Sequence, residues 1–386
     1  MFNITDDIIY VGVNDKDIDL FEGQYIVPNG MSYNSYLIKD DNYVLMDSVD
    51  VRKCDEWLNN VEIALDGHKL DYIVISHLEP DHSSSLGALL EKYPDVKIVS
   101  NSKVFDLLPQ FFTINDLEER KVVVDESTQL CTGAHTLNFY MAPMVHWPEV
   151  MFTFDERDKV LFAADAFGKF GSLDADEEWA CEARRYYFNI VGKYGPQVQS
   201  ILGKVGGLDI KTICPLHGPI LQENLSYYIN LYDIWSKYEV EAEGVFIAYA
   251  SIHGNTAKAA LKLKEILEEK GCKKVAISDL SREDFAEAIE DSFKYGKVVF
   301  AASSYNAKVF PPMERLLTLL KDKNYQKRTV ALIENGTWAP SAIRTMKEII
   351  SGMKDITIIE PEITIKTTMT DKNIKELEEL ADNLLK

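Results

Sequence analysis

The sequence predicts an α+β domain followed by an α/β domain. Up to about residue 220, short β-rich runs are separated by turns, with helical stretches that do not alternate strictly with them, which is typical of a mixed α+β sandwich. Beyond residue 243, strands and helices alternate, and five βα units predict a doubly wound, five-stranded parallel sheet. The acidic segment 239–244 is expected to be a linker, so we place the domains at residues 1–243 and 244–386.

The elements of the first domain are predicted from short apolar runs and the turns between them. Strands are expected at residues 43–46, 72–76, 97–100, 121–124 and 159–163. Residues 152–154 and 160–163 flank a polar turn, which predicts a hairpin. Apolar side chains at helical spacing predict one helix over residues 221–240: Leu225, Tyr228, Ile229, Tyr232 and Trp235.

The second domain is predicted as a regular series of strands and helices. The strands are expected at residues 245–250, 274–278, 298–302, 329–334 and 356–360. The helices are expected at residues 256–270, 283–292, 312–321, 341–353 and 372–385. Loops at the carboxyl ends of such parallel strands are where open α/β sheets bind their ligands.

Composition and charge exclude several classes of protein. The 386 residues include 62 acidic and 41 basic side chains, and the net charge of −21 has the wrong sign for a nucleic-acid partner. Apolar residues make up 46% of the chain, too many for a disordered protein, and no apolar run approaches the ~18 residues of a membrane span. The N-terminal residues lack the features of a secretory signal, so we expect a cytoplasmic protein with no membrane partner.

The cysteines indicate neither a disulfide framework nor a zinc–thiolate site. They are odd in number, widely scattered and never spaced as Cys-x-x-Cys, at positions Cys54, Cys131, Cys181, Cys214 and Cys272. We therefore expect buried free thiols.

A dense group of potential metal ligands follows the predicted strand 72–76. Four of the next six residues can ligate a metal, namely His77, Glu79, Asp81 and His82. A polar loop in which Asp81 or one of the serines at 83–85 caps the following helix would explain each residue separately, but not their density. Strand ends that display alternate side chains bring ligands together, so the group predicts metal binding.

Three more candidates lie in turn-like positions after other apolar runs: His146, Asp165 and His217. Each alone is more often a turn residue or a helix cap than a ligand. With the first group they make four imidazoles and three carboxylates, which suits two five- or six-coordinate ions that share one carboxylate. Such a mixed donor set favours iron or manganese over structural zinc and indicates redox chemistry. Two of the other three histidines, His68 and His135, lie in polar Gly-containing turns without companion carboxylates and are expected at the surface.

A candidate phosphate-binding loop follows the first strand of the second domain. It consists of Ser251, Ile252, His253, Gly254, Asn255 and Thr256, and it leads directly into a predicted helix. A loop of this kind presents backbone N–H groups to an anion. The alternative is an ordinary turn with Asn255 or Thr256 as the helix cap. The loop lacks the Lys of a Walker motif and the Gly spacing of a dinucleotide site, which favours a mononucleotide over ATP or NAD.

Two later strand ends carry loops that could complete a flavin site. One contains Ser303, Ser304, Tyr305, Asn306 and Ala307, and the other contains Asn335, Gly336, Thr337 and Trp338. Both follow parallel strands, where ligands of open α/β sheets bind. The ring of Trp338 or Tyr305 could stack on an isoalloxazine, although loop aromatics are also common surface anchors.

These residues resemble the flavodiiron proteins, or A-type flavoproteins, over essentially the whole chain. The resemblance implies a metallo-β-lactamase-like αββα sandwich followed by a flavodoxin-like domain. Zinc hydrolases of the first fold carry His-x-His-x-Asp-His, whereas this sequence has Glu79 in place of the second His, as the di-iron branch does. The resemblance implies that one iron is held by His77, Glu79 and His146, the other by Asp81, His82 and His217, and that Asp165 bridges them.

The resemblance also implies an oxidoreductase that holds FMN and two iron ions per chain. The favoured reaction is reduction of dioxygen to water, and reduction of nitric oxide to nitrous oxide on the same site is the alternative. A zinc-dependent hydrolase is the alternative from another class. Electrons would come from a separate donor, which could be a rubredoxin, a deazaflavin or a nicotinamide-linked reductase. The family implies a head-to-tail homodimer, or a dimer of such dimers.

Overall fold

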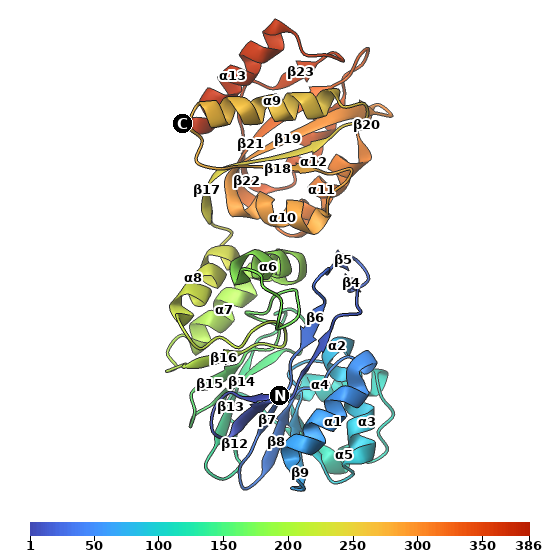
Figure 1. The fold of residues 1–386 in the computed structure, drawn as a ribbon, viewed down its shortest axis with the longest axis vertical. Helices are drawn as coiled ribbons and strands as arrows, with labels where there is room; N and C mark the ends of the chain where they lie inside the picture. The colour runs from blue at the N-terminus through green and yellow to red at the C-terminus, as the bar shows by residue number, and fades with distance from the viewer. The chain divides into compact units, whose positions relative to one another are not determined.

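The computed structural model describes all residues, 1–386, and divides the chain into two compact units (Figure 1). The first unit comprises residues 1–187 and 194–233, and the second comprises residues 188–193 and 234–386. The expectation that residues 239–244 form a linker is wrong in part, because strand β17 (Ala242–Ala250) begins within this segment. The domain boundary after residue 243 stays a prediction.

The first unit contains two facing β-sheets. The first sheet runs in the order β1-β2-β7-β8-β9-β10-β11, with parallel pairing from β8 to β11. Its strands are β1 (Phe2–Asn3), β2 (Ile8–Tyr10), β7 (Tyr36–Ile38), β8 (Tyr43–Met46), β9 (Leu70–Val74), β10 (Lys97–Ser100) and β11 (Lys121–Val123). The second sheet contains β12 (Gln129–Cys131), β13 (Thr136–Met141), β14 (Met151–Asp155), β15 (Val160–Phe162) and β16 (Thr212–Cys214) in sequential order. The predicted hairpin is confirmed as the antiparallel pair β14–β15.

Apolar side chains from both sheets form the core between them. Alternate residues of the strands point inward, so that Ile38, Val74, Phe139 and Phe162 are each at most 2% exposed. Helices flank the sheets: α1 (Cys54–Leu65), α2 (Pro80–Ser83), α3 (Leu86–Lys92), α4 (Ser102–Leu107), α5 (Leu117–Arg120), α6 (Trp179–Tyr186), α7 (Gly195–Val205) and α8 (Leu225–Ser236). The helix predicted over 221–240 is α8. Short paired strands complete the unit: β3 (Val13–Asp15) with β6 (Met31–Tyr33), and β4 (Leu20–Phe21) with β5 (Tyr25–Ile26).

The second unit is a doubly wound parallel sheet, as predicted. Its strand order is β18-β17-β19-β21-β22, all parallel, from β17, β18 (Val275–Asp279), β19 (Tyr295–Tyr305), β21 (Gln326–Asn335) and β22 (Lys354–Ile358). Strand β23 (Ile363–Ile365) also pairs with β21, and β20 (Lys308–Val309) turns back on β19. The order reverses between β17 and β19, and such a switch point opens a ligand crevice at the carboxyl ends of the strands.

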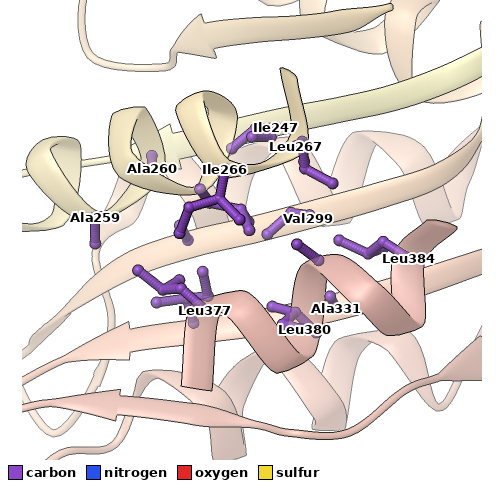
Figure 2. Packing of buried hydrophobic residues seen from close by; sticks show 14 of the residues in the cluster. Ile247, Ala259, Ala260, Ile266, Leu267, Val299, Ala331, Leu377, Leu380 and Leu384 are labelled. Atoms are coloured by element: carbon purple, nitrogen blue, oxygen red, sulfur yellow. The ribbon is translucent and has the colours of Figure 1, made fainter. Parts of the chain in front are cut away.

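Helices α9 (Asn255–Glu269) and α13 (Asp371–Leu385) pack together on one face of this sheet (Figure 2). Apolar residues of α13 recur every three or four positions and are fully buried: Leu377, Leu380, Ala381 and Leu384. Burial of each Leu stabilises the fold by roughly 1.5–3 kcal/mol. The remaining helices are α10 (Phe285–Lys294), α11 (Pro311–Asp322) and α12 (Ala342–Ile350). This packing positions the N-terminus of α9 at the carboxyl end of β17.

Two further expectations can be compared with the structure. The structure contains no disulfide, and Cys54 and Cys214 are buried, but Cys131 is exposed and Cys181 and Cys272 are partly exposed, so the expectation of buried thiols is wrong for these three. None of the helices has both the length and the apolar character needed to span a membrane.

Candidate functional site

The structure brings all seven predicted metal-ligand candidates together in the first unit. They come from loops that follow strands, and from α2, so side chains distant in the sequence meet at one end of the sandwich. Two groups result, the first formed by His77, Glu79, His146 and Asp165, and the second by Asp81, His82 and His217.

In the first group, two carboxylates face two imidazoles. Nε2 of His146 lies 2.9 Å from Oε2 of Glu79 and 2.9 Å from Oδ2 of Asp165. Nε2 of His77 lies 3.2 Å from the same Asp165 oxygen and 3.8 Å from Oε2 of Glu79. All four ligand atoms therefore converge on one small volume.

In the second group, one carboxylate faces two imidazoles. Oδ2 of Asp81 lies 3.1 Å from Nε2 of His217 and 3.4 Å from Nε2 of His82. The two Nε2 atoms are themselves 3.1 Å apart. One short helical turn, α2, supplies both Asp81 and His82, and this turn explains why these neighbours point to the same place.

Asp165 lies between the two groups. Its Oδ2 faces His77 and His146, whereas its Oδ1 lies 4.0 Å from Nε2 of His82 and 3.9 Å from Nε2 of His217. The preceding Ala164 has a φ of +47°, a left-handed conformation that is rare for a residue with a Cβ and common at functional sites. One carboxylate is thus aimed at both groups, one oxygen at each.

The donor atoms fit metal ions. Both ring nitrogens of His77, both carboxylate oxygens of Asp81, Nδ1 of His82 and Oδ1 of Asp165 are buried without a hydrogen-bond partner. Buried polar groups are normally paired, because leaving one unpaired costs roughly 1–3 kcal/mol. Several such atoms in one place are the pattern that ligands of a cation would show.

Surrounding residues hold the candidate ligands in place. Nδ1 of His217 donates to the carbonyl of Ser32 at 2.7 Å, which leaves Nε2 as the metal-facing nitrogen. Oδ1 of Asp47 accepts from the backbone N–H of Ser76 at 2.7 Å, and Glu149 accepts from the N–H of Leu78 at 3.0 Å. Both bonds brace the loop that carries His77. Sequence reasoning missed these supporting residues, since nothing in the chain marks Ser32, Asp47 or Glu149 as neighbours of the site.

The candidate ligands differ in protonation state before any ion binds. The carboxylates of Asp165, Glu79 and Asp81 outweigh burial and raise the pKa of His77, His146 and His217, so an ion must displace protons from these imidazoles. Burial would raise the pKa of Glu79, but the nearby imidazoles of His146 and His77 outweigh it and hold that pKa at about 2. Burial and the nearby His217 lower the pKa of His82 to about 4, so this imidazole is neutral at pH 7. Metal ligands must be deprotonated, and these two meet that condition before any ion binds.

A cavity of about 340 Å³ opens beside the candidate ligands. Its lining includes Glu79 and Asp81, together with Phe21, Glu22 and Tyr33. Partial desolvation beside this cavity and the charge of Glu79 raise the pKa of Glu22 to about 7. A small molecule could therefore approach the metal ligands from solvent past a carboxyl group that is partly protonated at neutral pH.

Of the two histidines expected at the surface, only His68 is exposed. His68 is exposed and stacks on Tyr43 with ring centroids 4.8 Å apart, but His135 is fully buried. Its Nδ1 lies 3.1 Å from Asp155 and its Nε2 lies 3.1 Å from the guanidinium of Arg157. The Gly-containing turn gave no sign that the charged groups of other segments cover this imidazole.

Stability of the first unit is expected to depend on the protonation of His135. Burial and the charge of Arg157 would both lower the pKa of this imidazole. The carboxylates of Asp155 and Asp158 outweigh them, so the pKa is raised. A third carboxylate, that of Asp7, lies 3.6 Å from Nε2 of His135. A raised folded-state pKa stabilises the fold below the ordinary value near 6.5, and this contribution is lost as pH rises through the folded value.

The urea concentration at the unfolding midpoint should therefore decrease as the pH rises above 6.5. A His135→Gln variant should lose this slope and about 1–3 kcal/mol at pH 6, whereas His68→Gln should behave like the parent chain. An unchanged slope in His135→Gln would show that another group is responsible.

The second unit contains a cleft of about 550 Å³ at the carboxyl ends of its strands. All predicted flavin-binding residues except Ser251 and Gly254 line it. Sequence reasoning missed three further lining residues, Ala339, Ser341 and Thr367. The hydroxyl of Thr367 forms a hydrogen bond with that of Thr337 at 2.8 Å. Thr367 comes shortly after β23, and this position after a strand is the one feature of the sequence that could have indicated its place in the cleft.

The predicted phosphate loop lies at the N-terminus of α9. Gly254, with a φ of +86°, is the residue before the helix, and no side chain caps its first turn, so the alternative of Asn255 or Thr256 as the cap is wrong. Oγ of Ser251 accepts from the N–H of Gly254 at 3.0 Å, and the hydroxyls of Thr256 and Ser303 pair at 2.9 Å. Uncapped N–H groups and hydroxyls at a helix N-terminus form an anion site.

The two loops that carry Tyr305 and Trp338 both line the cleft. Asn306 and Ala307 form the two-residue tip of the β19–β20 hairpin, both with positive φ. Tyr305 is 45% exposed and Trp338 is 91% exposed. Both rings are thus available to a planar ligand, and stacking on a flavin stays a prediction.

Comparisons with known proteins agree with this architecture. Residues 31–218 match the model of the ODP family beta lactamases, and residues 246–355 match the flavodoxin domain. The chain is 29% identical to the nitric oxide reductase of Moorella thermoacetica, over 98% of this chain and 96% of that protein. It is 27% identical to the rubredoxin-oxygen oxidoreductase of Megalodesulfovibrio gigas, over 99% and 96%. The crystal structure of the flavodiiron protein from Giardia intestinalis superimposes with a TM-score of 0.92, at 25% identity, and covers 99% of this chain and 95% of that one.

The predicted resemblance to the flavodiiron proteins is therefore confirmed over the whole chain. The predicted order of a metallo-β-lactamase-like domain and a flavodoxin-like domain is confirmed. The prediction of an oxidoreductase is also confirmed, because the relatives carry the names of reductases and an oxidoreductase.

Proposed function

We propose that this protein reduces dioxygen to water at a non-haem di-iron centre that receives electrons from FMN. The observation that carries the proposal is the position of Asp165, with one oxygen facing each of two groups that contain the other six candidate ligands. Three carboxylates and four imidazoles suit iron, which prefers such mixed donors. The uncapped helix and the hydroxyl-rich loop of the second unit suit the phosphate of FMN.

The proposed roles of the side chains follow from their contacts. His77, Glu79 and His146 would hold one ion and Asp81, His82 and His217 the other, while Asp165 would set the separation of the two. Bound FMN supplies two electrons and a ferrous pair two more, which matches the four that dioxygen requires. Rings of Phe21, Tyr33 and Tyr186 lie 5.4–5.9 Å from that of His217 and limit access of water.

Glu22 lines the 340 Å³ cavity beside the candidate metal ligands. Because its pKa is about 7, its carboxyl would carry a proton in part of the molecules at pH 7.

Nitric oxide is the second candidate substrate. The relatives named nitric oxide reductase support it, and its reduction to nitrous oxide requires only two electrons. Parallel assays of the same preparation with each gas decide between them: the proposal expects faster consumption of dioxygen, and consumption of nitric oxide alone would reverse the assignment.

Elemental analysis distinguishes the proposal from a zinc-dependent hydrolase of metallo-β-lactamase type. We expect close to two irons and one FMN per chain, with little zinc, when the protein is produced with adequate iron. Active protein that contains zinc and no iron would support the hydrolase. The three carboxylates among the candidate ligands and the separate flavin cleft favour iron and redox chemistry.

We also propose that a separate protein or cofactor donates electrons, and that two chains form a head-to-tail homodimer. A relative named rubredoxin-oxygen oxidoreductase supports a rubredoxin, with a deazaflavin or a nicotinamide-linked reductase as alternatives. The family resemblance supports pairing in which the flavin of one subunit serves the metal pair of the other, in a closed two-fold dimer or a dimer of such dimers.

Mixed subunits test this pairing. Gly254→Glu should remove FMN and Asp165→Ala should remove the metals, so each homodimer should be inactive. In a random equal mixture, half of the dimers are mixed and each keeps one intact pair, so about a quarter of the parent activity should return. Mixed dimers that stay inactive, or an active monomer in sedimentation, would contradict the pairing.

A further inference from the structure

A third group of possible metal ligands lies in the first unit, apart from the seven candidate ligands of the di-iron centre. Carboxylate oxygens of Asp7 and Asp158 and a ring nitrogen of His135 lie within 4.8 Å of one another. Asp7 directly precedes β2, His135 directly precedes β13, and Asp158 lies in the turn between β14 and β15. The proposed function uses none of these three residues.

This group lies at the other end of the strands from the di-iron ligands. His135 comes before β13 and His146 follows that strand, whereas Asp158 comes before β15 and Asp165 follows it. The two positions are therefore separated by the length of the strands. An ion bound at the third group cannot share ligands with the di-iron centre.

Asp155 fixes the orientation of the His135 imidazole. Both side chains are fully buried, and Nδ1 of the ring lies 3.1 Å from Oδ2 of Asp155. A carboxylate behind one ring nitrogen is the usual support of a metal-binding histidine, because it holds a proton on Nδ1 and leaves the lone pair on Nε2. Nε2 in turn lies 3.6 Å from Oδ2 of Asp7. Two ligands bound to one zinc ion at ~2.0–2.2 Å lie roughly 3.4 Å apart, so this spacing fits with little movement.

The guanidinium of Arg157 lies among the three candidate ligands. Its Nη1 is 3.1 Å from Nε2 of His135, its Nη2 is 2.6 Å from Oδ2 of Asp7, and its Nε is 3.7 Å from Oδ1 of Asp158. The group thus already faces a cation, but the charge of one guanidinium does not balance those of two carboxylates. The Arg157 side chain is 41% exposed, and ion pairs of such exposed side chains are weak, so a divalent ion can displace it toward solvent.

We infer that Asp7, His135 and Asp158 bind a divalent transition-metal ion, which takes the place of the Arg157 guanidinium. One imidazole and two carboxylates are ordinary ligands of zinc, and water completes the tetrahedral shell. Zinc is the probe of choice, because N/O sites bind it more tightly than manganese or ferrous iron. Release of Arg157 opposes binding, so the purified protein contains little zinc at this site until zinc is added. The bound ion joins the turn before β2, in the first sheet, to two turns of the second sheet.

The test adds Zn²⁺ to the iron-loaded, full-length chain at pH 8 and measures zinc and iron per chain by equilibrium dialysis and elemental analysis. The parent chain should bind one zinc per chain and keep its iron. His135→Gln loses the nitrogen ligand and should bind this zinc on the order of 100-fold more weakly. Asp7→Asn changes a partly exposed side chain that matters less to folding, and it should weaken binding at least about tenfold.

Variants of Arg157 show whether the guanidinium and the ion compete for one position. Arg157→Ala removes two contacts of the folded chain, yet it should strengthen zinc binding about tenfold, because a positive charge leaves the site. Arg157→Lys keeps the charge and should stay close to the parent. His68→Gln removes an exposed imidazole outside the group and should also match the parent.

The inference is overturned if the parent chain binds no zinc beyond what replaces iron, or if His135→Gln and Asp7→Asn bind zinc as tightly as the parent. Zinc binding that is unchanged or weaker in Arg157→Ala also overturns it. Failure of the proposed di-iron function would show separately, as a parent chain without iron. The third group would then still be judged by the difference in bound zinc between the parent and His135→Gln.

Discussion

Replacement of Asp165 by Ala should remove metal from both positions and abolish gas reduction. Its two oxygens face different ligand groups, so each ion would lose one anionic ligand, and the remaining carboxylates, Asp81 and Glu79, could not compensate. Iron should fall from close to two per chain to a small fraction of one, and activity should fall on the order of 100-fold or more. Elemental analysis and gas consumption measure the two effects on the same sample.

Matched variants distinguish bridging from a general loss of structure. Asp174→Ala removes an exposed aspartate from the same loop region and should keep both metals. His146→Ala and His217→Ala each remove a ligand from one group only, and each should spare part of the metal. If Asp165→Ala retains one iron while either histidine variant loses both, Asp165 is not shared between the ions.

The substitution Gly254→Glu should abolish FMN binding. The residue lies at the N-terminus of α9 with a φ of +86°, and no atom lies within 4 Å of the position that a Cβ would occupy. A glutamate there would be accommodated sterically, but its carboxylate would repel the phosphate at the place where the helix dipole attracts it. We expect affinity for FMN to fall at least about 100-fold, measured by flavin fluorescence.

The backbone conformation requires its own control, because any side chain at this φ adds roughly 1–2 kcal/mol of strain. Gly254→Asn serves this purpose, since asparagine tolerates the left-handed region and carries no charge. It should keep most of the FMN affinity. Equal losses in both variants would assign the effect to the backbone rather than to charge.

Local patterns in the sequence predicted the regular elements and the residues that bear chemistry. The strands at 43–46 and 97–100 coincide with β8 and β10, because short apolar runs between turns leave little choice of register. His77, Glu79, Asp81 and His82 were conspicuous because they crowd into six residues. His146, Asp165 and His217 were predicted from their places after apolar runs, and the structure brings them to the same site.

Features that depend on contacts distant in the chain could not be predicted. Ser32 orients His217 across 185 positions, and no local pattern connects them. His135 is buried because Asp7 and Arg157, from other segments, close over its turn. Residues 188–193 belong to the second unit although the chain around them belongs to the first, which no periodicity reveals. Such pairings arise from tertiary packing, which overrides local propensity.

The most direct test of the redox di-iron account is an electron count in a single turnover. The protein is fully reduced under anaerobic conditions, its FMN and iron are quantified, and it is mixed with a limiting amount of dioxygen in a stopped-flow instrument. The account predicts that FMN and iron together lose four electrons for each dioxygen consumed, and that water forms without hydrogen peroxide. Consumption of two electrons per dioxygen with stoichiometric hydrogen peroxide, or no reaction of the reduced protein with dioxygen, would contradict it.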